Sequence, residues 1–327
     1  MSILKPSPIL KNGTVSIVSL SDSSVAVNPV ELSNIQNWFS KRGYQAKIHP
    51  ICYQFADGAS VTVEERASAL EDAFKDKKVD GIFSLRGGNG CIPMLPYIDF
   101  SIIANNPKFF CGYCDPSAFS LAAFKECQLV TFHGATAYHF QDQYEGSRKH
   151  KARRKNRHLT REKSLEAMNG RLDENLFGDT NIKLLVPGEA EGKLFATHRY
   201  VLDEMLNAQS SFLPDFKNSI LVIQDYPLDI ETWKNSLNKW EKAGVFSNIA
   251  GMIIGHLPVV KDKKTLEELQ SLAEQLAIDY ARQYHFPLIG GAPFGNAHPN
   301  LPLPQGINAR LDSSSLRLLE NPFCKPA

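Results

Sequence analysis

The chain has 327 residues, 43% of them hydrophobic, with 36 lysines and arginines against 35 aspartates and glutamates. This length fits two domains with a large buried core, and the balanced charge excludes a general attraction to nucleic acid or to membrane surfaces. No apolar run approaches the ~20 residues of a membrane span, and the start of the chain, broken by Pro6 and Pro8, does not resemble a secretory signal.

The first part of the chain alternates short apolar runs with helical patterns. The predicted strands cover residues 14–20, 45–51, 79–85, 108–113 and 128–134, and the predicted helices cover 30–43, 63–74 and 116–127. Strands that alternate with helices predict a parallel sheet covered on both faces.

The middle of the chain has a different composition. Residues 146–163 form a dense basic run with almost no apolar side chains, which we interpret as a solvated linker. A nucleic-acid or acidic-partner patch is the alternative, but the run lacks the interleaved aromatic residues of such surfaces. We therefore expect an N-terminal α/β domain over 1–140, a basic linker over 141–178 and a C-terminal domain over 179–327.

The alternation resumes after this segment. Residues 219–225, 249–256 and 286–295 predict strands, and residues 233–244 and 265–284 predict helices. Glycine and proline are frequent from 293 to 306, which indicates an irregular segment near the end of the chain.

Cys114 lies where a predicted strand turns into a predicted helix. Such a corner projects a side chain away from the backbone, and the helix N-terminus favours a thiolate. Asp115 has the character of an N-cap and Pro116 that of a first helical residue, and the Asp115 amide is placed to bind an oxyanion. Cys114 is therefore a candidate nucleophile. The alternative is a buried structural cysteine, which is the commonest fate of a free thiol.

Two other uses of cysteine are open. Six cysteines in a chain of this length are not typical of a disulfide framework, so we expect a protein of the reducing cytoplasm. Cys111 and Cys114 form a C-x-x-C ahead of a helix, as in redox motifs, but the capping signal puts Cys114 and not Cys111 at the helix start. A zinc site is disfavoured because no second C-x-x-C follows, and we expect no metal and no cofactor.

The loop that follows the predicted strand 79–85 is rich in glycine. Arg86, Gly87 and Gly88 leave backbone amides free to approach a ligand, and Arg86 offers a bidentate partner for a carboxylate. The loop lacks the lysine and hydroxyl residue of a phosphate-binding loop. We predict that Arg86 and Gly87 contact substrate and that the backbone amides of Gly88 and Asp115 together form an oxyanion hole. A tight turn is the plainer alternative.

In order along the chain, the segments FSLRGGNGC, KFFCGYCDPSAF, VTFHG, ILVIQD, GMIIGHL and PLIGGAPFGNAHPNLPLPQG resemble the LD-carboxypeptidase family, to which the microcin C immunity peptidases belong. The resemblance covers nearly the whole chain except the basic segment. It implies an N-terminal parallel-sheet α/β domain that carries the nucleophile, a C-terminal mixed α/β domain, and a Ser-Glu-His triad shared between them. It also implies a cytoplasmic, metal-free homodimer that cleaves peptides at an L,D bond.

The positions of the family's triad are substituted in this chain. The resemblance places Cys114 at the serine, Gln224 at the glutamate and Asn296 at the histidine. Glutamine and asparagine do not take up a proton at neutral pH, so the usual general base is missing. His298, two residues beyond Asn296, is the candidate replacement.

Two interpretations of these substitutions stay open. A thiol needs a base less than a hydroxyl does, so Cys114 could act in acyl transfer, cyclisation or hydrolysis of a small peptide-like or activated acyl substrate. Alternatively, the protein is a catalytically inactive homologue that binds a peptide ligand. We expect neither a membrane nor a nucleic acid as partner.

Overall fold

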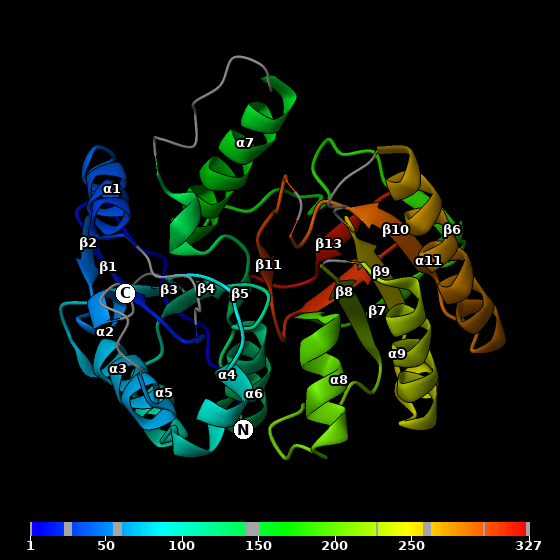
Figure 1. The fold of residues 1–327 in the computed structure, drawn as a ribbon, viewed down its shortest axis with the longest axis horizontal. Helices are drawn as coiled ribbons and strands as arrows, with labels where there is room; N and C mark the ends of the chain where they lie inside the picture. The colour runs from blue at the N-terminus through cyan, green and yellow to red at the C-terminus, as the bar shows by residue number, and fades with distance from the viewer. Residues whose placement is uncertain are drawn as a thin grey trace.

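Two sheets organise the chain, one in each half (Figure 1). The computed structural model describes residues 2–22, 28–54, 61–141, 151–226, 228–257, 263–296 and 298–324. In spatial order, the first sheet consists of β11 (Leu303–Pro304), β5 (Phe132–His133), β4 (Phe109–Gly112), β3 (Gly81–Ser84), β1 (Thr14–Val18) and β2 (Gln45–Ile48). All neighbours in it are parallel except β11, which runs antiparallel to β5.

The second sheet is mixed. In spatial order it consists of β13 (Leu316–Leu318), β12 (Asn308–Leu311), β7 (Ala190–His198), β8 (Ser219–Gln224), β9 (Gly251–Gly255), β10 (Leu288–Ala292) and β6 (Lys183–Val186). Strands β7 to β10 are parallel, and antiparallel strands flank them on both sides. The predicted class is thus confirmed: an α/β protein with a largely parallel N-terminal sheet and a mixed C-terminal sheet.

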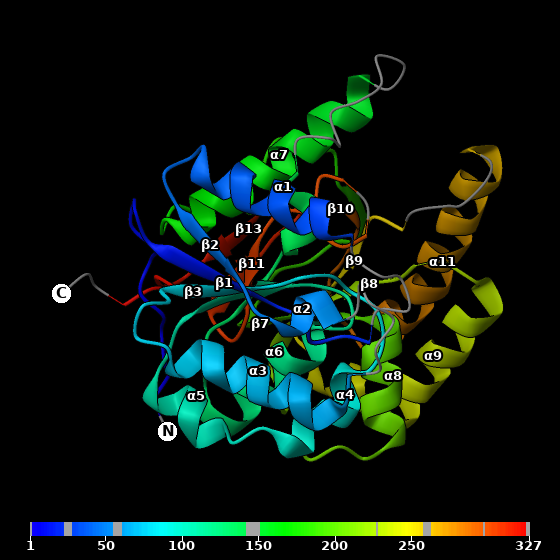
Figure 2. The same cartoon turned by 60° about the vertical axis from the view of Figure 1, so that its left-hand side comes forward.

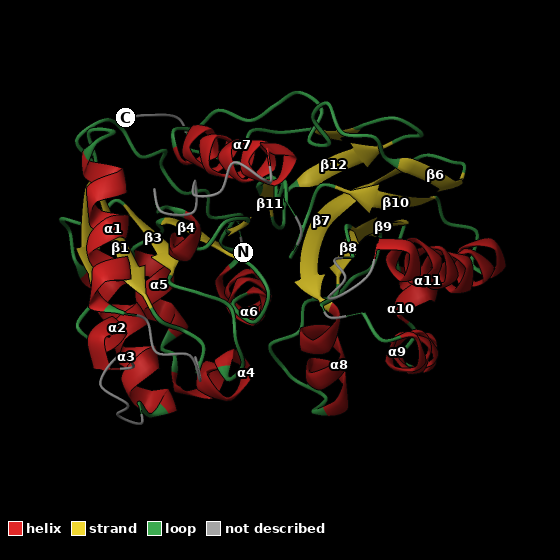
Figure 3. Cartoon of the chain, turned by 45° about the horizontal axis from the view of Figure 1, so that its top comes forward, coloured by secondary structure: helices red, strands yellow, loops and turns green. Residues whose placement is uncertain are grey.

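Helices cover both faces of the first sheet, whereas α8 (Arg199–Asn207), α9 (Ile230–Lys242), α10 (Val245–Asn248) and α11 (Lys263–Gln283) lie together on one side of the second sheet (Figures 2 and 3). The α-helices of the first half are α1 (Pro29–Ser40), α2 (Ile51–Gln54), α3 (Val63–Lys75), α4 (Cys91–Met94), α5 (Phe100–Asn105) and α6 (Ser117–Cys127). Between these two sets in the chain comes α7 (Lys151–Met168). The short 3-10 helices η2 (Leu95–Tyr97) and η3 (Ala137–His139) complete the set among the described residues.

Aromatic side chains show why both faces of the first sheet are covered. Phe83 on β3 packs against Phe39 of α1 with ring centroids 5.8 Å apart. Phe110 on β4 packs against Phe119 of α6 at 4.7 Å. Phe110 pairs with Ile82, the residue before Phe83 on β3. Because successive side chains of a strand alternate between faces, the rings of Phe83 and Phe110 point to opposite faces of the sheet. An apolar residue at each successive strand position therefore requires helices on both sides.

The basic segment differs from its prediction as a linker. Residues 151–168 form helix α7, which buries Ala167 and Met168 completely and also buries polar residues such as Thr160. The linker prediction is wrong for these residues: within the basic run the buried side chains are polar and give no apolar signal, and the fully buried apolar residues of the helix come after the run. The rest of the run, 146–150, lies outside the described residues, and the domain boundaries stay a prediction.

Strand β11 joins the last part of the chain to the first sheet. Leu303 and Pro304 pair with His133 and Phe132 of β5. The residues just before β11 lead from the second sheet and include the segment around Asn296. The carboxyl ends of β4 and β5 are thereby brought next to residues from the second half of the chain.

Helix α7 provides a test of its own contribution to stability. Met168 is fully buried at the end of α7, so Met168→Ala leaves a cavity and should lower the free energy of unfolding by about 2–5 kcal/mol. Lys155→Ala, on the exposed side of the same helix, should change it by less than about 0.5 kcal/mol. Urea unfolding followed by circular dichroism measures both. If Met168→Ala lowered the free energy of unfolding no more than Lys155→Ala does, Met168 of α7 would not contribute to the core.

Candidate active site

Cys114 occupies the corner between β4 and α6, as the sequence predicts. Its backbone φ of 65° lies in the left-handed region, which residues other than glycine adopt only where the surrounding structure requires it. The Cys114 carbonyl accepts hydrogen bonds from the Ser117 amide at 2.9 Å and from the Ser117 hydroxyl at 2.6 Å. A turn of this kind is the geometry of a nucleophile elbow.

The glycine loop lies directly against this thiol. A β-carbon added to Gly87 would approach Cβ of Cys114 to 3.0 Å and Sγ to 3.3 Å, so any side chain there would crowd the thiol. The backbone amides of Gly88 and Asp115 both lie close enough to Sγ to favour its thiolate form. The two amides predicted as oxyanion donors therefore lie together beside Cys114.

The protonation state of Cys114 differs from the expectation of an easily formed thiolate. Burial and the nearby Asp115 carboxylate raise the pKa of Cys114 to about 11, and they outweigh the amides of Asp115 and Gly88 and the side chain of Asn296, which lower it. Only roughly one thiol in ten thousand is then ionised at pH 7. The expected lowering of the Cys114 pKa by the N-terminus of α6 does not prevail, because burying a thiolate costs more free energy than the backbone amides recover.

Asp115 differs from its predicted role as the N-cap of α6. The helix begins at Ser117, and Pro116 takes the cap position without a side-chain hydrogen bond. The buried Asp115 carboxylate instead accepts a hydrogen bond from the Cys91 amide at 3.0 Å, at the start of α4. Burial raises the pKa of Asp115 to about 6, although the Cys91 hydrogen bond lowers it. The carboxylate therefore links two neighbouring elements under the thiol.

The structure brings Gln224 and Asn296 to the same region as Cys114. Gln224 is the last residue of β8, and its buried side chain packs against the backbone of Gly295. Neither Oε1 nor Nε2 of Gln224 has a hydrogen-bond partner among the described residues. Nδ2 of Asn296 lies near enough to the Cys114 thiol to lower its pKa, but it makes no hydrogen bond of good geometry there or to another described residue. Buried polar atoms without a partner are uncommon and point to a bound water or ligand.

The loop that carries Asn296 is held by helix α7. The Gly295 amide donates to Oδ1 of the buried Asn300 at 2.9 Å, and the Asn300 amide donates to the Thr160 hydroxyl at 2.9 Å. Nδ1 of His298 lies 3.2 Å from the same hydroxyl. The predicted replacement base, His298, thus faces α7.

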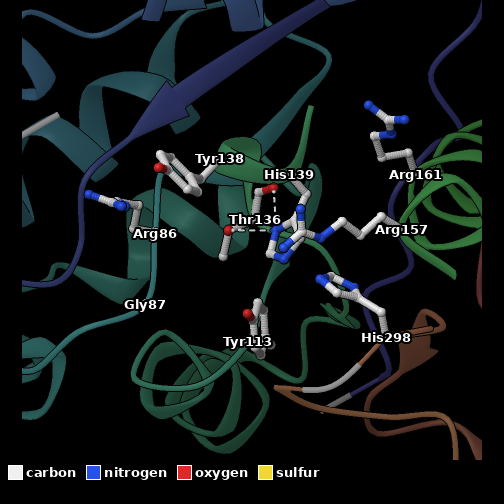
Figure 4. A pocket seen from close by; sticks show the side chains of 9 residues that line it. All are labelled: Arg86, Gly87, Tyr113, Thr136, Tyr138, His139, Arg157, Arg161 and His298. Atoms are coloured by element: carbon white, nitrogen blue, oxygen red, sulfur yellow. Dashed lines mark hydrogen bonds between the residues drawn. The ribbon is translucent and has the colours of Figure 1, made fainter. Parts of the chain in front are cut away.

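A cavity of about 250 Å³ opens beside the thiol, in the region shown in Figure 4. It is lined by Arg86, Gly87, Tyr113, Thr136, Tyr138, His139, Arg157, Arg161 and His298. The two residues predicted to contact substrate, Arg86 and Gly87, are both in its wall. The Arg86 guanidinium lies over the Tyr138 ring, 3.8 Å from its centroid, which fixes it by a cation–π contact.

Two histidines that the sequence analysis did not single out also lie near the corner. His133 pairs with Gly112 at the ends of β5 and β4, and His198 pairs with Gln224 at the ends of β7 and β8. The His198 amide lies 3.4 Å from the Ser117 hydroxyl. Burial lowers the pKa of both histidines to about 3, so both are neutral at pH 7. The sequence could have indicated these two histidines only through their position at the carboxyl ends of strands, where the functional residues of α/β proteins commonly lie.

The alternative uses of cysteine receive no support from the geometry. Cys111 is buried, its thiol donates to the Ala135 carbonyl at 3.4 Å, and burial raises its pKa. A redox pair requires an accessible cysteine of low pKa, so the C-x-x-C interpretation is wrong. Within the described ranges, no group of three or more His, Cys, Asp or Glu side chains is arranged to hold a metal ion, and no helix has the length and apolar content to cross a membrane.

Comparison with known protein families gives two matches. The LD-carboxypeptidase N-terminal domain matches residues 15–134, and the LD-carboxypeptidase C-terminal domain matches residues 191–311. A probable murein peptide carboxypeptidase of Bacillus subtilis is 24% identical over 316 residues, which cover 95% of this chain and 92% of the relative. The microcin C7 self-immunity protein MccF of Escherichia coli is 24% identical over 274 residues, or 77% of each chain.

Solved structures show the same fold. MccF in complex with glutamyl sulfamoyl guanosine superposes with a TM-score of 0.81 at 18% identity, over 98% of this chain and 100% of that chain. An MccF-like protein from Streptococcus pneumoniae in complex with AMP superposes with a TM-score of 0.75 at 20% identity, over 94% and 98%.

The raised pKa of Cys114 predicts a steep pH dependence of alkylation. Because the thiolate is the reactive form, labelling by iodoacetamide should be slow at pH 7 and should accelerate about tenfold per pH unit up to about pH 10. Peptide mapping by mass spectrometry follows Cys114 separately from Cys324; these two cysteines are partly buried, and the other four are fully buried. The control is the protein unfolded in guanidinium, where the rate should level off near pH 9. A plateau below pH 9 in the folded protein would contradict the raised pKa.

Proposed function

The chain belongs to the LD-carboxypeptidase family, and on that premise we propose that its site performs acyl chemistry on the thiol of Cys114. The observation that carries the proposal is the position of this thiol, at a left-handed corner with the Gly88 and Asp115 amides beside it. These amides are placed to stabilise the oxyanion of a tetrahedral intermediate. If Cys114 stands at the position of the family's serine, as the resemblance implies, that position still holds a nucleophilic side chain.

The first step is the transfer of an acyl group to sulfur. Sγ attacks the acyl carbon, the sulfur–carbon bond forms, the bond from that carbon to the leaving group breaks, and the thiol proton passes to the leaving group. The product is a thioester on Cys114 and a free alcohol, thiol or amine. An acceptor amine, hydroxyl or water then attacks the thioester, takes the acyl group and returns a proton to sulfur. The overall result is transfer, cyclisation or hydrolysis, depending on the acceptor.

The surroundings of the thiol favour a substrate with a good leaving group. An amine is a poor leaving group unless an acid protonates it as the bond breaks. The side chains of Gln224 and Asn296 are amides, which do not release a proton at neutral pH and cannot provide this assistance. A thioester or an activated ester needs less assistance because its leaving group is less basic. We infer a small acyl or peptide-like substrate that is activated at the acyl carbon.

The relatives support a substrate of this general kind. One is named a murein peptide carboxypeptidase, and MccF has been solved with glutamyl sulfamoyl guanosine, an aminoacyl compound. The roles of Gln224 and Asn296 in this chain would be to orient such a substrate. Their unpartnered amide atoms are available for hydrogen bonds to it.

A second candidate function is peptide binding without catalysis. The observation that favours it is the pKa of Cys114, which burial raises to about 11, together with amides at both positions where a proton acceptor would be expected. Such a site would bind an acyl or peptide ligand through the same backbone amides and leave it unchanged.

Intact-mass spectrometry separates the two functions. The protein is incubated with an aminoacyl thioester, an aminoacyl p-nitrophenyl ester and an L,D-dipeptide. We expect a mass increase of one acyl group with the activated donors, its loss in Cys114→Ala, and its retention in the matched control Cys324→Ser. Cys114→Ser should be nearly inactive because the amides Gln224 and Asn296 cannot take the proton of a hydroxyl. Binding of donors without any adduct or turnover would support the inactive homologue instead.

Restoring the family's residues is a second test. The triple variant Cys114→Ser, Gln224→Glu, Asn296→His should gain hydrolysis of an L,D-peptide, because the corner and its amides are retained. Each single reversion should give less than about a tenth of that rate, since triad members act as a unit. The measurement is release of the C-terminal D-amino acid. A triple variant no more active than the parent protein would show that these three positions do not form the triad.

A further inference from the structure

A cluster of three buried polar side chains lies beside the glycine loop and the Cys114 corner. Its members are Ser21, which follows β1, Arg66 on α3, and Asp115, and their exposed fractions are 1%, 3% and 1%. Each has one polar atom without a hydrogen-bond partner among the described residues: Oγ of Ser21, Nε of Arg66 and Oδ1 of Asp115. Buried polar atoms of this kind are uncommon, so three of them in one cluster point to a molecule that binds there.

The three side chains lie near one another. The Ser21 hydroxyl is near enough to the Asp115 carboxylate to lower its pKa, although the two groups make no hydrogen bond of good geometry. The charge of Arg66 lowers the same pKa. One guanidinium nitrogen of Arg66 donates to the Leu20 carbonyl at 2.6 Å and to the Gly90 carbonyl at 3.0 Å, which fixes the guanidinium next to the residue that precedes Ser21.

The three unpartnered atoms match the hydrogen bonds of one water molecule. Nε of Arg66 can only donate, the Asp115 carboxylate accepts, and the Ser21 hydroxyl can do either. A water that accepts from Nε still has two protons and a lone pair, so it can donate to Oδ1 of Asp115 and share a hydrogen bond with Oγ of Ser21. Internal waters typically make about three such bonds to buried polar groups.

The same cluster holds the glycine loop. A β-carbon added to Gly88 would approach Cβ of Ser21 to 3.0 Å, so Gly88 packs directly on Ser21. At the far end of the loop, the Cys91 amide donates to the Asp115 carboxylate at 3.0 Å. Both ends of the segment 88–91 therefore contact the cluster, and the Gly88 amide lies beside Sγ of Cys114.

We propose that this cluster binds one internal water, and that Asp115, together with this water, is a positioning residue that holds the Gly88 amide in the oxyanion hole. Hydrogen bonds to charged groups are strong in a site shielded from solvent, so the attachment is firm. The water and the attachment of the loop are independent of the chemistry at Cys114, whereas the effect on acyl transfer rests on the proposed function.

A high-resolution crystal structure of the protein tests the water directly. We expect one water within hydrogen-bond distance of Oγ of Ser21, Nε of Arg66 and Oδ1 of Asp115. A structure in which these side chains bond directly to one another, with no water between them, would overturn the proposal.

Hydrogen–deuterium exchange followed by mass spectrometry tests the attachment of the loop. Ser21→Ala removes one bond to the water without removing a charge, so it should accelerate exchange of the amides of residues 87–91 at least fivefold. The matched control is Ser120→Ala, because the Ser120 hydroxyl is also buried and without a partner among the described residues but lies on α6. It should change the exchange less than twofold. Unchanged exchange in Ser21→Ala, shown to be folded by circular dichroism, would overturn the proposal.

Two substitutions of Asp115 test its carboxylate and give a second measurement if Ser21→Ala does not fold. Asp115→Ala removes the acceptor of the Cys91 amide and should accelerate exchange over residues 87–91 at least tenfold. Asp115→Asn keeps an oxygen that accepts from this amide, so the acceleration should stay below about threefold. Equal exchange in the two variants would show that the side chain of Asp115 does not hold the loop.

Acyl transfer from an aminoacyl p-nitrophenyl ester relates the loop to the chemistry. An oxyanion hole stabilises the transition state and not the bound donor. Ser21→Ala should therefore lower the acylation rate at saturating donor at least fivefold and leave the half-saturating concentration within twofold. An unchanged rate in this variant, when its loop exchanges faster, would overturn the positioning role. If the wild-type protein forms no adduct, the thiol chemistry fails, and the water and the exchange rates alone decide this inference.

Discussion

The pairing of β11 with β5 is the constraint on which the site depends. It attaches the end of the chain to the first sheet, next to the strand that leads into Cys114. Immediately afterwards, the Gln305 side chain accepts a hydrogen bond from the Ala196 amide on β7, and the Gly306 amide donates to the Leu194 carbonyl. One short segment is thus bonded to both sheets, so the carboxyl ends of their strands keep a fixed separation.

Helix α7 adds a second restraint across the same junction. Its Thr160 hydroxyl holds Asn300, which in turn holds the backbone before Asn296. On the side of the first sheet, Glu162 lies 3.6 Å from Arg42. The helix therefore positions the loop beside the thiol and at the same time presents arginines to the adjoining cavity. The contacts that hold this segment, with few apolar residues, are these hydrogen bonds, the ion pair and the buried Ala167 and Met168.

The sequence is most informative where one short pattern carries the geometry. A strand that runs into Gly-Tyr-Cys-Asp-Pro predicts the corner at Cys114. The apolar runs predict all strands of the first sheet except β11, but only β8, β9 and β10 of the second sheet. Helix α7 was not foreseen because the basic run buries polar side chains such as Thr160 and Arg161, which have no apolar period, and the apolar Ala167 and Met168 lie beyond that run. The pKa of Cys114 was predicted in the wrong direction because burial, which the sequence does not show, and the charge of the adjacent Asp115 outweigh the backbone amides. The position of His198 near the site was not predicted, because it depends on the pairing of β7 with β8, which places His198 beside Gln224.

The raised pKa of Cys114 affects how readily its thiol is oxidised. Peroxides oxidise thiolates and react slowly with protonated thiols, so cysteines of low pKa are the ones lost first to sulfenic and sulfinic acids. With a pKa of about 11, Cys114 is almost entirely protonated at neutral pH. The thiol should therefore withstand peroxide that inactivates enzymes whose cysteines are ionised at neutral pH.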